Sequence, residues 1–252
     1  MKKSGKIIIL VGLALLTLIM YRVYTVKTLN AEAVLGKDIV KKLDYKEDFE
    51  FKKGDTSNSN DTYYKMSVKK LDGFSVTNVL PYNDIQEGMD TMYSKTYTLD
   101  EDKDKNGLRT SYSFGSYPFY TTLFENDEEQ YDNNVGKFKY SEVMKKYDIN
   151  TVLDIVNFIK DNHNKNNNIF YSKSKLKDDY IVYKFAKNVV PQGVESISKV
   201  TGDYNGIVYN IKDVKEVHLF GKNRDYVFTF YNLEHFTDEV IKDFIGSLKY
   251  ED

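Results

Sequence analysis

The apolar positions near the start of the chain form one continuous run, unlike any later segment. Residues from Ile7 to Met20 include ten Ile, Leu or Val side chains. Each contributes about −0.3 to −0.6 kcal/mol at the centre of a bilayer, or roughly −3 to −6 kcal/mol together. Extended to Val26, the run makes about 30 Å of helix, which matches the hydrocarbon core. The pattern predicts a transmembrane helix over residues 7–26.

Basic residues fix the expected orientation of this helix. Lys2, Lys3 and Lys6 precede the apolar run, and lysines favour the cytoplasmic side. We therefore expect a cytoplasmic tail at residues 1–6, an uncleaved signal anchor, and a single-pass protein of the cell membrane whose C-terminal domain lies outside. A cleaved signal peptide is one alternative, because residues 31–33 (AEA) have the small-x-small form. A buried helix of a cytoplasmic protein is another.

A less regular segment follows the apolar run. The apolar residues between Ala31 and Leu43 lie near one helical stripe, which is compatible with a stalk. The stretch from Asp44 to Asp61 ends in GDTSNSND, a composition typical of loops. Residues 27–61 are accordingly expected to be a stalk or linker, and an extracytoplasmic domain is expected over residues 62–252.

Beyond this point, apolar and polar residues alternate with the two-residue period of strands. The segments with this pattern are Thr62–Lys69, Phe74–Leu80, Met92–Leu99, Arg109–Phe114, Tyr117–Phe124, Ile169–Ser172, Asp179–Lys187, Gly206–Ile211, Val214–Phe220 and Tyr226–Tyr231. Residues 115–118 (GSYP) are interpreted as a turn between two of them. Short turn-like stretches separate the last three strands, which favours antiparallel hairpins.

Three segments have the spacing of helices: Ser141–Tyr147, Val152–Asp161 and a C-terminal helix that begins after Thr237. Thr237 is the expected N-cap, and Phe236 and Ile241 occupy the positions of a hydrophobic staple. The expected buried face of this helix consists of Val240, Ile241, Phe244, Ile245 and Leu248. The predicted fold class is α+β, a mostly antiparallel sheet with packed helices preceded by one transmembrane helix. We expect one globular domain, with two as the alternative.

The amino-acid composition excludes several kinds of functional site, although it says little about the fold. The chain has no cysteine, which excludes disulfides, thiolate metal sites and a cysteine nucleophile. Its formal net charge of −2 does not favour nucleic acid as a partner. Tryptophan is absent and tyrosine occurs 22 times, so Tyr and Phe must supply the large core side chains.

One short stretch, DKDKNGL, resembles the first half of a calcium loop. Asp102, Asp104 and Asn106 place oxygen atoms at positions 1, 3 and 5, and Gly107 stands at position 6. Position 12, which needs a bidentate carboxylate, is Ser113, and the flanking residues are strand-like rather than helical. Because Asn-Gly is also a strong hairpin signal, a polar turn is preferred. A low-affinity calcium site is the alternative, and no other cofactor is expected.

The remaining candidate residues carry no recognised catalytic pattern. The acidic stretch Glu125–Asp132 is interpreted as a solvated loop, with a surface for a cation or basic partner as the alternative. His163, His218 and His235 are too dispersed to form a metal motif by spacing. The chain lacks a G-x-S-x-G elbow and a glycine-rich phosphate loop. We therefore assign no catalytic residue.

Two stretches resemble a known fold. Asp72–Pro81 (DGFSVTNVLP) resembles the opening strand and turn of the Mog1/PsbP-like α/β sandwich. Tyr226–Tyr231 (YVFTFY), followed by Phe236–Lys249, is similar to its closing strand and helix. The two ends are common in bacterial membrane-anchored proteins of unknown role, although the segment between them is longer here than in the family. The resemblance implies a binding or assembly module.

The expected function follows from these points together. We expect a membrane-anchored, extracytoplasmic, non-catalytic binding or assembly module whose partners are the membrane and another envelope protein or surface polymer. One alternative is a hydrolase of envelope polymers that uses carboxylates of the acidic loops. Another is a ligand-binding sensory domain with an apolar pocket lined by Tyr and Phe.

Overall fold

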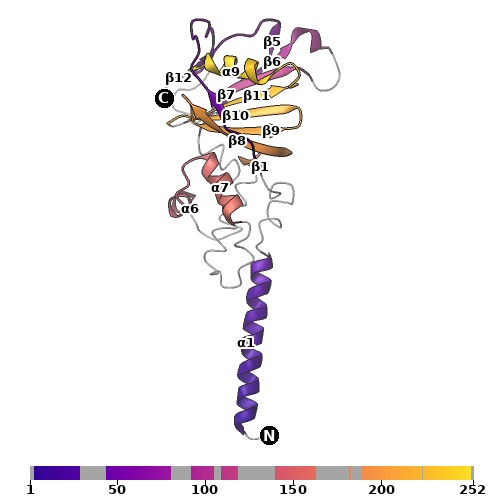
Figure 1. The fold of residues 1–252 in the computed structure, drawn as a ribbon, viewed down its shortest axis with the longest axis vertical. Helices are drawn as coiled ribbons and strands as arrows, with labels where there is room; N and C mark the ends of the chain where they lie inside the picture. Colours follow the sequence, from indigo (N-terminus) through magenta and orange to yellow (C-terminus); the bar gives the residue numbers. More distant parts are fainter. Residues whose placement is uncertain are drawn as a thin grey trace. The chain divides into compact units, whose positions relative to one another are not determined.

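The computed structural model describes residues 3–28, 44–80, 92–104, 109–118, 140–162, 182, 189–222 and 224–250. Figure 1 shows the helices and strands of these ranges. The chain divides into two compact units, each described by itself. The first comprises Met1–Lys42, Asn126–Asn150 and Asp154–Val190, and the second comprises Leu43–Glu125, Thr151–Leu153 and Pro191–Asp252.

The N-terminal helix of the first unit, α1 (Lys3–Thr28), exposes its apolar side chains. The large hydrophobic residues from Ile7 to Tyr21 have exposed fractions of 53–72%. The segment Gly5–Arg22 is long and apolar enough to cross a membrane, and none of it is buried in the structure. The apolar N-terminal helix expected from the sequence is therefore confirmed as a helix.

Two further helices, α6 (Tyr140–Lys146) and α7 (Val152–Asn162), agree with the helical spacing in the sequence. The apolar residues at that spacing in α7 are buried: Val152, Ile155, Val156 and Ile159. Tyr147, which follows α6, lies edge-on to Phe158 of α7 with 4.6 Å between the ring centroids. This aromatic contact joins the two helices.

The second unit is built around a nine-stranded sheet. Its strands are β1 (Asp44–Tyr45), β2 (Phe49–Phe51), β5 (Phe74–Leu80), β6 (Tyr93–Leu99), β7 (Ser111–Pro118), β8 (Val194–Gly202), β9 (Gly206–Ile211), β10 (Val214–Phe220) and β11 (Arg224–Tyr231). The order is β1-β8-β9-β10-β11-β7-β6-β5, and β2 also pairs with β8. The pairs of β8 with β1 and β2 are parallel and all others in this sheet are antiparallel. A mostly antiparallel sheet combined with helices was predicted, and this is confirmed.

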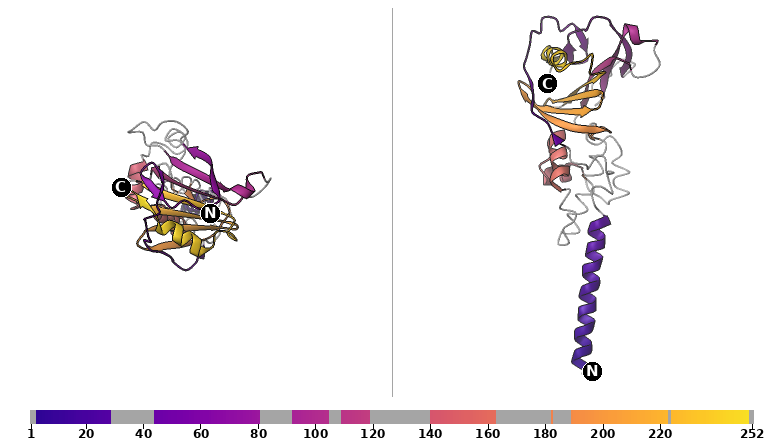
Figure 2. Two further views of the ribbon diagram at one scale, coloured as in Figure 1. Left: turned by 90° about the horizontal axis from the view of Figure 1, so that it is seen from above. Right: turned by 45° about the vertical axis from the view of Figure 1, so that its right-hand side comes forward.

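A smaller antiparallel sheet and one helix complete the second unit. The small sheet has the order β12-β4-β3, with β12 at Lys249–Tyr250, β4 at Met66–Val68 and β3 at Asp61–Tyr63. The helix α9 (Asp238–Gly246) lies along one face of the large sheet (Figure 2).

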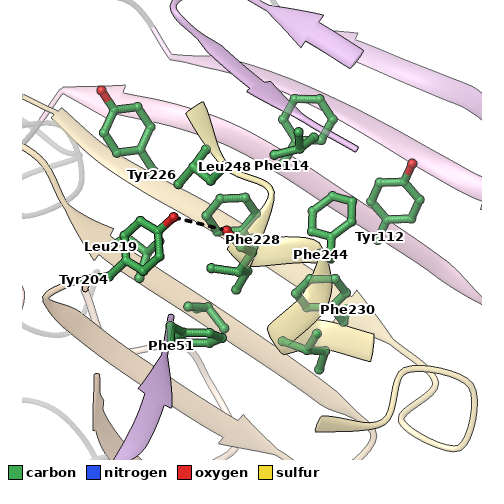
Figure 3. Packing of buried hydrophobic residues seen from close by; sticks show 14 of the residues in the cluster. Phe51, Tyr112, Phe114, Tyr204, Leu219, Tyr226, Phe228, Phe230, Phe244 and Leu248 are labelled. Carbon is green, nitrogen blue, oxygen red and sulfur yellow. Dashed lines mark hydrogen bonds between the residues drawn. The ribbon is translucent and has the colours of Figure 1, made fainter. Parts of the chain in front are cut away.

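Aromatic side chains fill the core between α9 and this face of the large sheet. Phe244 of α9 lies 5.2 Å from Tyr112 and 5.6 Å from Phe230, measured between ring centroids. Tyr97 and Tyr112 are stacked at 4.9 Å. These separations are those of favourable aromatic pairs, and Figure 3 shows several of these rings packed together. With no tryptophan in the chain, Tyr and Phe supply this core, as predicted.

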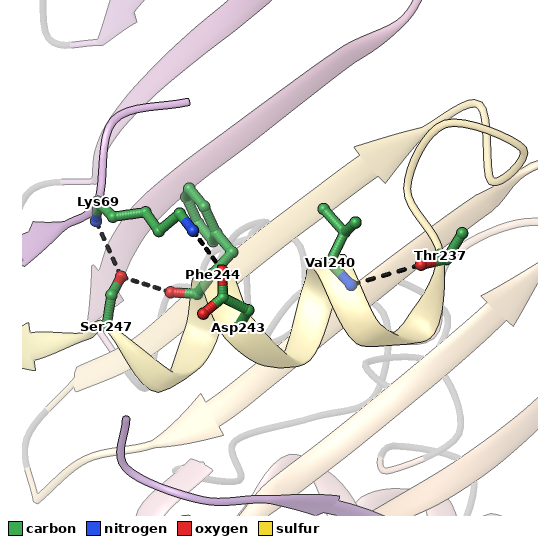
Figure 4. Close-up of polar contacts among 6 residues, drawn as sticks. All are labelled: Lys69, Thr237, Val240, Asp243, Phe244 and Ser247. Atoms are coloured by element: carbon green, nitrogen blue, oxygen red, sulfur yellow. Dashed lines mark hydrogen bonds and ion pairs between the residues drawn. The ribbon is translucent and has the colours of Figure 1, made fainter. Parts of the chain in front are cut away.

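Both ends of α9 are fixed by side chains. The backbone N–H of Val240 donates to Oγ1 of Thr237 over 3.4 Å, so the predicted N-cap is confirmed. At the other end Ser247 Oγ donates to the carbonyl of Phe244 over 2.6 Å and accepts from the backbone N–H of Lys69 over 2.8 Å. Figure 4 shows these bonds together with the ion pair between Lys69 and Asp243. This second end ties α9 to the segment after β4.

Parts of the expected linker belong to the sheet. Residues 44–61 were expected to connect the stalk to the domain, but β1 and β2 pair with β8. Phe49 and Phe51 are buried in the core while Glu50 between them is exposed. This three-residue alternation is too short to be distinguished from a loop by its pattern. The expectation of a loop at residues 52–60 agrees with the structure.

Two predicted strand boundaries were also wrong. Gly115 lies inside β7 rather than in a turn, since it pairs with Ser94 of β6 and Val227 of β11. Glycine is needed there because a Cβ would lie 2.3 Å from the Tyr93 carbonyl oxygen of the neighbouring strand. The predicted strand Thr62–Lys69 is a hairpin of β3 and β4, which turns at Tyr64 with φ of +52°. The predicted strand Ile169–Ser172 lies outside the described residues, as does Asp179–Lys187 apart from Val182.

Candidate functional site

The residues of the candidate calcium loop are only partly described. Asp102 ends the short 3₁₀ helix η1 (Asp100–Asp102), and its Oδ2 accepts the backbone N–H of Thr110 over 3.0 Å. Asp104 is exposed, and Asn106 lies outside the described residues. The Asp102 carboxylate thus helps close the connection between β6 and β7. The calcium site itself stays a prediction.

A second carboxylate in this connection is also engaged. Oδ1 of Asp100 accepts a hydrogen bond from Ser75 of β5 over 2.6 Å and pairs with Lys103 over 2.7 Å. The hydrogen bonds from Lys103 and then Ser75 lower the pKa of Asp100. This carboxyl group is therefore ionised at neutral pH. The β6–β7 hairpin predicted at this point is confirmed, because Leu99 N–H donates to Thr110 O over 2.9 Å.

The other sequence candidates are only partly described. The acidic stretch Glu125–Asp132 and His163 lie outside the described residues. His235 is exposed, with its ring edge-on to Phe74 and Phe236. In the described ranges, no group of three His, Asp or Glu residues is arranged to hold a metal ion.

The most site-like cluster lies on β9 and β10, where Glu216 stands opposite Tyr209 in the register. His218 is two residues beyond Glu216, so strand alternation places both on one face of the sheet. Val217 and Leu219 point to the opposite face and pack in the core with α9. The strand period therefore collects a carboxylate, an imidazole and a phenol on the face that does not carry α9.

The side chains of Glu216, His218 and Tyr209 lie close together. Nε2 of His218 lies 2.5 Å from Oε1 of Glu216. The His218 ring is edge-on to Tyr209, with centroids 5.2 Å apart and planes at 89°. The exposed fractions are 3% for His218 and 0% for Tyr209. Such burial is unusual for polar side chains and makes every contact in the cluster energetically important.

Two polar atoms of the cluster have no hydrogen-bond partner among the residues that the structure describes. They are Oη of Tyr209 and Nδ1 of His218. Burial first, and then the nearby Glu216 and Asp225, raise the pKa of Tyr209 well above its usual value. The phenol therefore stays protonated and neutral at any physiological pH. Leaving such a group unbonded costs about 1–3 kcal/mol.

This cluster has the groups of acid–base chemistry but little access to solvent. A carboxylate that orients an imidazole beside a neutral phenol can exchange protons with a substrate that reaches it. With His218 and Tyr209 almost fully covered, no substrate reaches these atoms unless the structure opens. In the observed state the cluster acts as a polar support inside the sheet. His218 stood alone among the sequence candidates and Tyr209 was not among them, since only the strand register brings the two together.

A buried ion pair joins the small sheet to the large one. Nζ of Lys95 on β6 lies 3.0 Å from Oδ1 of Asp61 on β3, and both side chains are largely buried. Lys95 also donates to the Thr62 carbonyl over 3.4 Å. Its ammonium lies 5.3 Å from the centre of the Tyr63 ring. Because three groups of β3 surround one lysine, this pair fixes the position of β3 on the large sheet.

Comparisons of the chain with protein-family models, with curated proteins and with solved structures find no match in any of the three. The resemblance to the Mog1/PsbP-like sandwich therefore stays a prediction. Function has to be argued from the residues themselves.

Proposed function

We propose that this chain is a membrane-anchored, extracytoplasmic binding or assembly module. The observation that carries the proposal is the exposed apolar surface of α1. Isolated apolar residues at a protein surface are common, but a continuous apolar surface indicates a partner or a membrane. A helix that is apolar on all sides over a bilayer's thickness fits lipid better than water.

The charges around α1 support one orientation. Lys2, Lys3 and Lys6 lie at its N-terminal end, which favours a cytoplasmic N-terminus. The sheet unit then lies on the outer side. The absence of cysteine from the chain is compatible with that compartment.

The described carboxylates give the hydrolase alternative little support. A general acid at neutral pH needs a raised pKa, whereas the pKa of Asp100 is lowered by its contacts with Lys103 and Ser75. Asp102 is bonded to the backbone of Thr110. These two carboxylates hold the β6–β7 connection together, which is a structural role.

The sensory alternative requires Tyr and Phe side chains that line an open pocket. In the core beside α9 these rings touch one another instead, as in the stacked pair Tyr97 and Tyr112. The described aromatic residues thus favour a rigid module that acts through its surface. The partner expected is another envelope protein or a surface polymer.

Fractionation and protease protection test this proposal. The full-length chain, tagged at its C-terminus, should stay with membranes after a carbonate wash. Protease added to intact cells with a permeable outer layer should remove the tag, while a cytoplasmic marker protein survives. An intact chain in the soluble fraction, or a tag protected until the membrane is opened, contradicts the proposal.

A further inference from the structure

The edge strands of the two sheets differ in how they are protected. Unpaired strand edges bind other strands, and proteins usually shorten such edges or place charges on them. β1, β2, β3 and β12 are two or three residues long, and each contains an Asp, Glu or Lys residue. β5 is seven residues long, reads FSVTNVL and has no charged side chain. Among the described strands, β5 is the one long edge without these protections.

The outer side of β5 has no partner strand among the residues that the structure describes. In the described part of the chain β5 pairs with β6 alone. Val76 and Leu80 have exposed fractions of 48% and 49%, and Thr77 and Asn78 between them are also exposed. At the end of the strand the Leu80 carbonyl accepts a hydrogen bond from Tyr63 Oη over 2.9 Å. The middle of β5 therefore offers both backbone groups and apolar side chains to a partner.

We propose that β5 pairs antiparallel with β5 of a second copy of this chain in the membrane. In a two-fold arrangement each residue of the strand meets a residue of the same strand. Like charges placed opposite each other oppose such pairing, and β5 has none. Its uncharged sequence offers no charge by which to select a different partner.

The contact between two β5 strands is small, so the proposed pairing depends on confinement of the chains to one membrane. A seven-residue strand pair is much smaller than the roughly 1,200–2,000 Å² of a stable interface. A register irregularity between Val76 and Asn78 shortens the regular part further. Pairing of free chains in solution is therefore expected to be weak. Chains confined to one membrane meet at a much higher effective concentration, so the inference rests on the anchor proposed above.

The absence of cysteine makes a direct test simple. Single cysteines are placed at Thr77 or Asn78 in the full-length chain, near the centre of β5, and membranes are treated with a mild oxidant. A disulfide forms only when the two Cα atoms come within about 7 Å. A disulfide-linked dimer is expected from at least one of these positions. Glu195→Cys, at an exposed position of β8, is the control and should give no dimer.

The second measurement is the dimer yield after a charge has been introduced on β5. In the Asn78→Cys background, Val76→Lys brings two like charges near the symmetry axis and should lower the dimer yield about fivefold. Val240→Lys is the matched control, because Val240 is another exposed valine, on α9. It should leave the yield unchanged.

The outcomes separate the pairing from the anchor. A membrane-bound chain that gives no dimer from either cysteine overturns the pairing and leaves the anchor intact. The pairing is also overturned if Val76→Lys has no effect, or if the cross-linked product has the mass of an adduct with another protein. A chain recovered only in the soluble fraction contradicts the anchor and, with it, membrane-confined pairing.

Discussion

The helices α1 and α9 are both rich in large apolar residues, yet they present them in opposite ways. In α1 these side chains surround the helix and are exposed. In α9 Ile241, Phe244 and Ile245 occupy one stripe and are buried against the sheet. The same hydrophobic effect therefore acts differently on the two helices: burial of its apolar stripe lets α9 stabilise the fold, whereas the described chain does not cover the apolar side chains of α1.

The largest expected effect comes from charging α1. Replacing Leu13 and Leu16 together by Asp changes the insertion free energy by about 6–8 kcal/mol. This exceeds the favourable contribution of the entire apolar run, so the double variant should disappear from carbonate-washed membranes. Leu13→Ala with Leu16→Ala is the control and should remain there. If the Asp variant stays membrane-bound, α1 is not the anchor.

Removing a buried ring from α9 should have the next largest effect. Phe244→Ala deletes contacts with Tyr112, Phe228 and Phe230 and should lower the free energy of unfolding by about 3–5 kcal/mol. The matched control Val240→Ala removes an exposed side chain of the same helix and should change it by about 0.5 kcal/mol. Urea denaturation of the two variants gives both values. Equal losses would mean that α9 does not pack as the structure shows.

Gly246 in α9 and Gly12 in α1 differ in the space available for one added methyl group. A Cβ on Gly246 of α9 would lie 3.0 Å from the Lys52 carbonyl oxygen and 3.2 Å from the Gly54 nitrogen. Gly246→Ala should therefore destabilise the protein by about 1–3 kcal/mol. Gly12 of α1 has nothing within 4 Å of an added Cβ. Gly12→Ala should leave stability and membrane binding unchanged, and a loss there would reveal an unsuspected contact of α1.

The smallest expected effect is a pH dependence at the end of α9. Tyr204 Oη donates to the Ile245 carbonyl over 3.4 Å, and burial, followed by Tyr250 and Asp203, raises the pKa of Tyr204 to about 12. Because the pKa in the folded state lies above the unfolded value of about 10, this contribution is complete below pH 10. It is lost as the pH rises through 12.

Tyr204→Phe is the variant that tests this dependence. At neutral pH it should lower the free energy of unfolding by about 0.5–1.5 kcal/mol, the contribution of one hydrogen bond. Between pH 10 and 12 its stability should fall less steeply than that of the parent chain. Urea denaturation across this range measures both effects. Identical slopes for the two chains would show that Tyr204 ionises as freely in the folded state as in the unfolded state.

The elements that the sequence predicted best are those whose signals are local. Thr237 caps α9 as expected, and β5, β9 and β10 have the predicted bounds. Val240 was expected on the buried face of α9 and is instead exposed. It lies in the first turn, where helical spacing alone does not determine which residues the sheet covers.

The strand β8 was missed because its pattern is mixed. Its sequence VESISKVTG contains two serines that are buried, Ser196 and Ser198. Buried serine looks like a loop residue when only hydrophobicity is considered. The neighbouring strands β1, β2 and β9 supply the backbone partners that make this segment a strand.

The candidate site, like β8, could be predicted only in part from local sequence patterns. Glu216 and His218 are two residues apart, and the strand period alone predicts that they share a face. Tyr209 joins them only because β9 and β10 pair in one particular register. A shift of one residue in that pairing would point Tyr209 into the opposite face. Neither the cluster nor the raised pKa of Tyr209 could be derived without knowing the register between β9 and β10.

What the sequence determined by itself was short in range: the apolar length of α1, the cap of α9, and the alternation of the central strands. Each depends on residues within a few positions of one another, so the chain encodes them directly. Only the tertiary structure decided which strands became edges, which polar groups were buried together, and which glycines had to stay small. These properties depend on pairings between residues far apart in the chain, such as β2 with β8, and many pairings are compatible with the same local pattern.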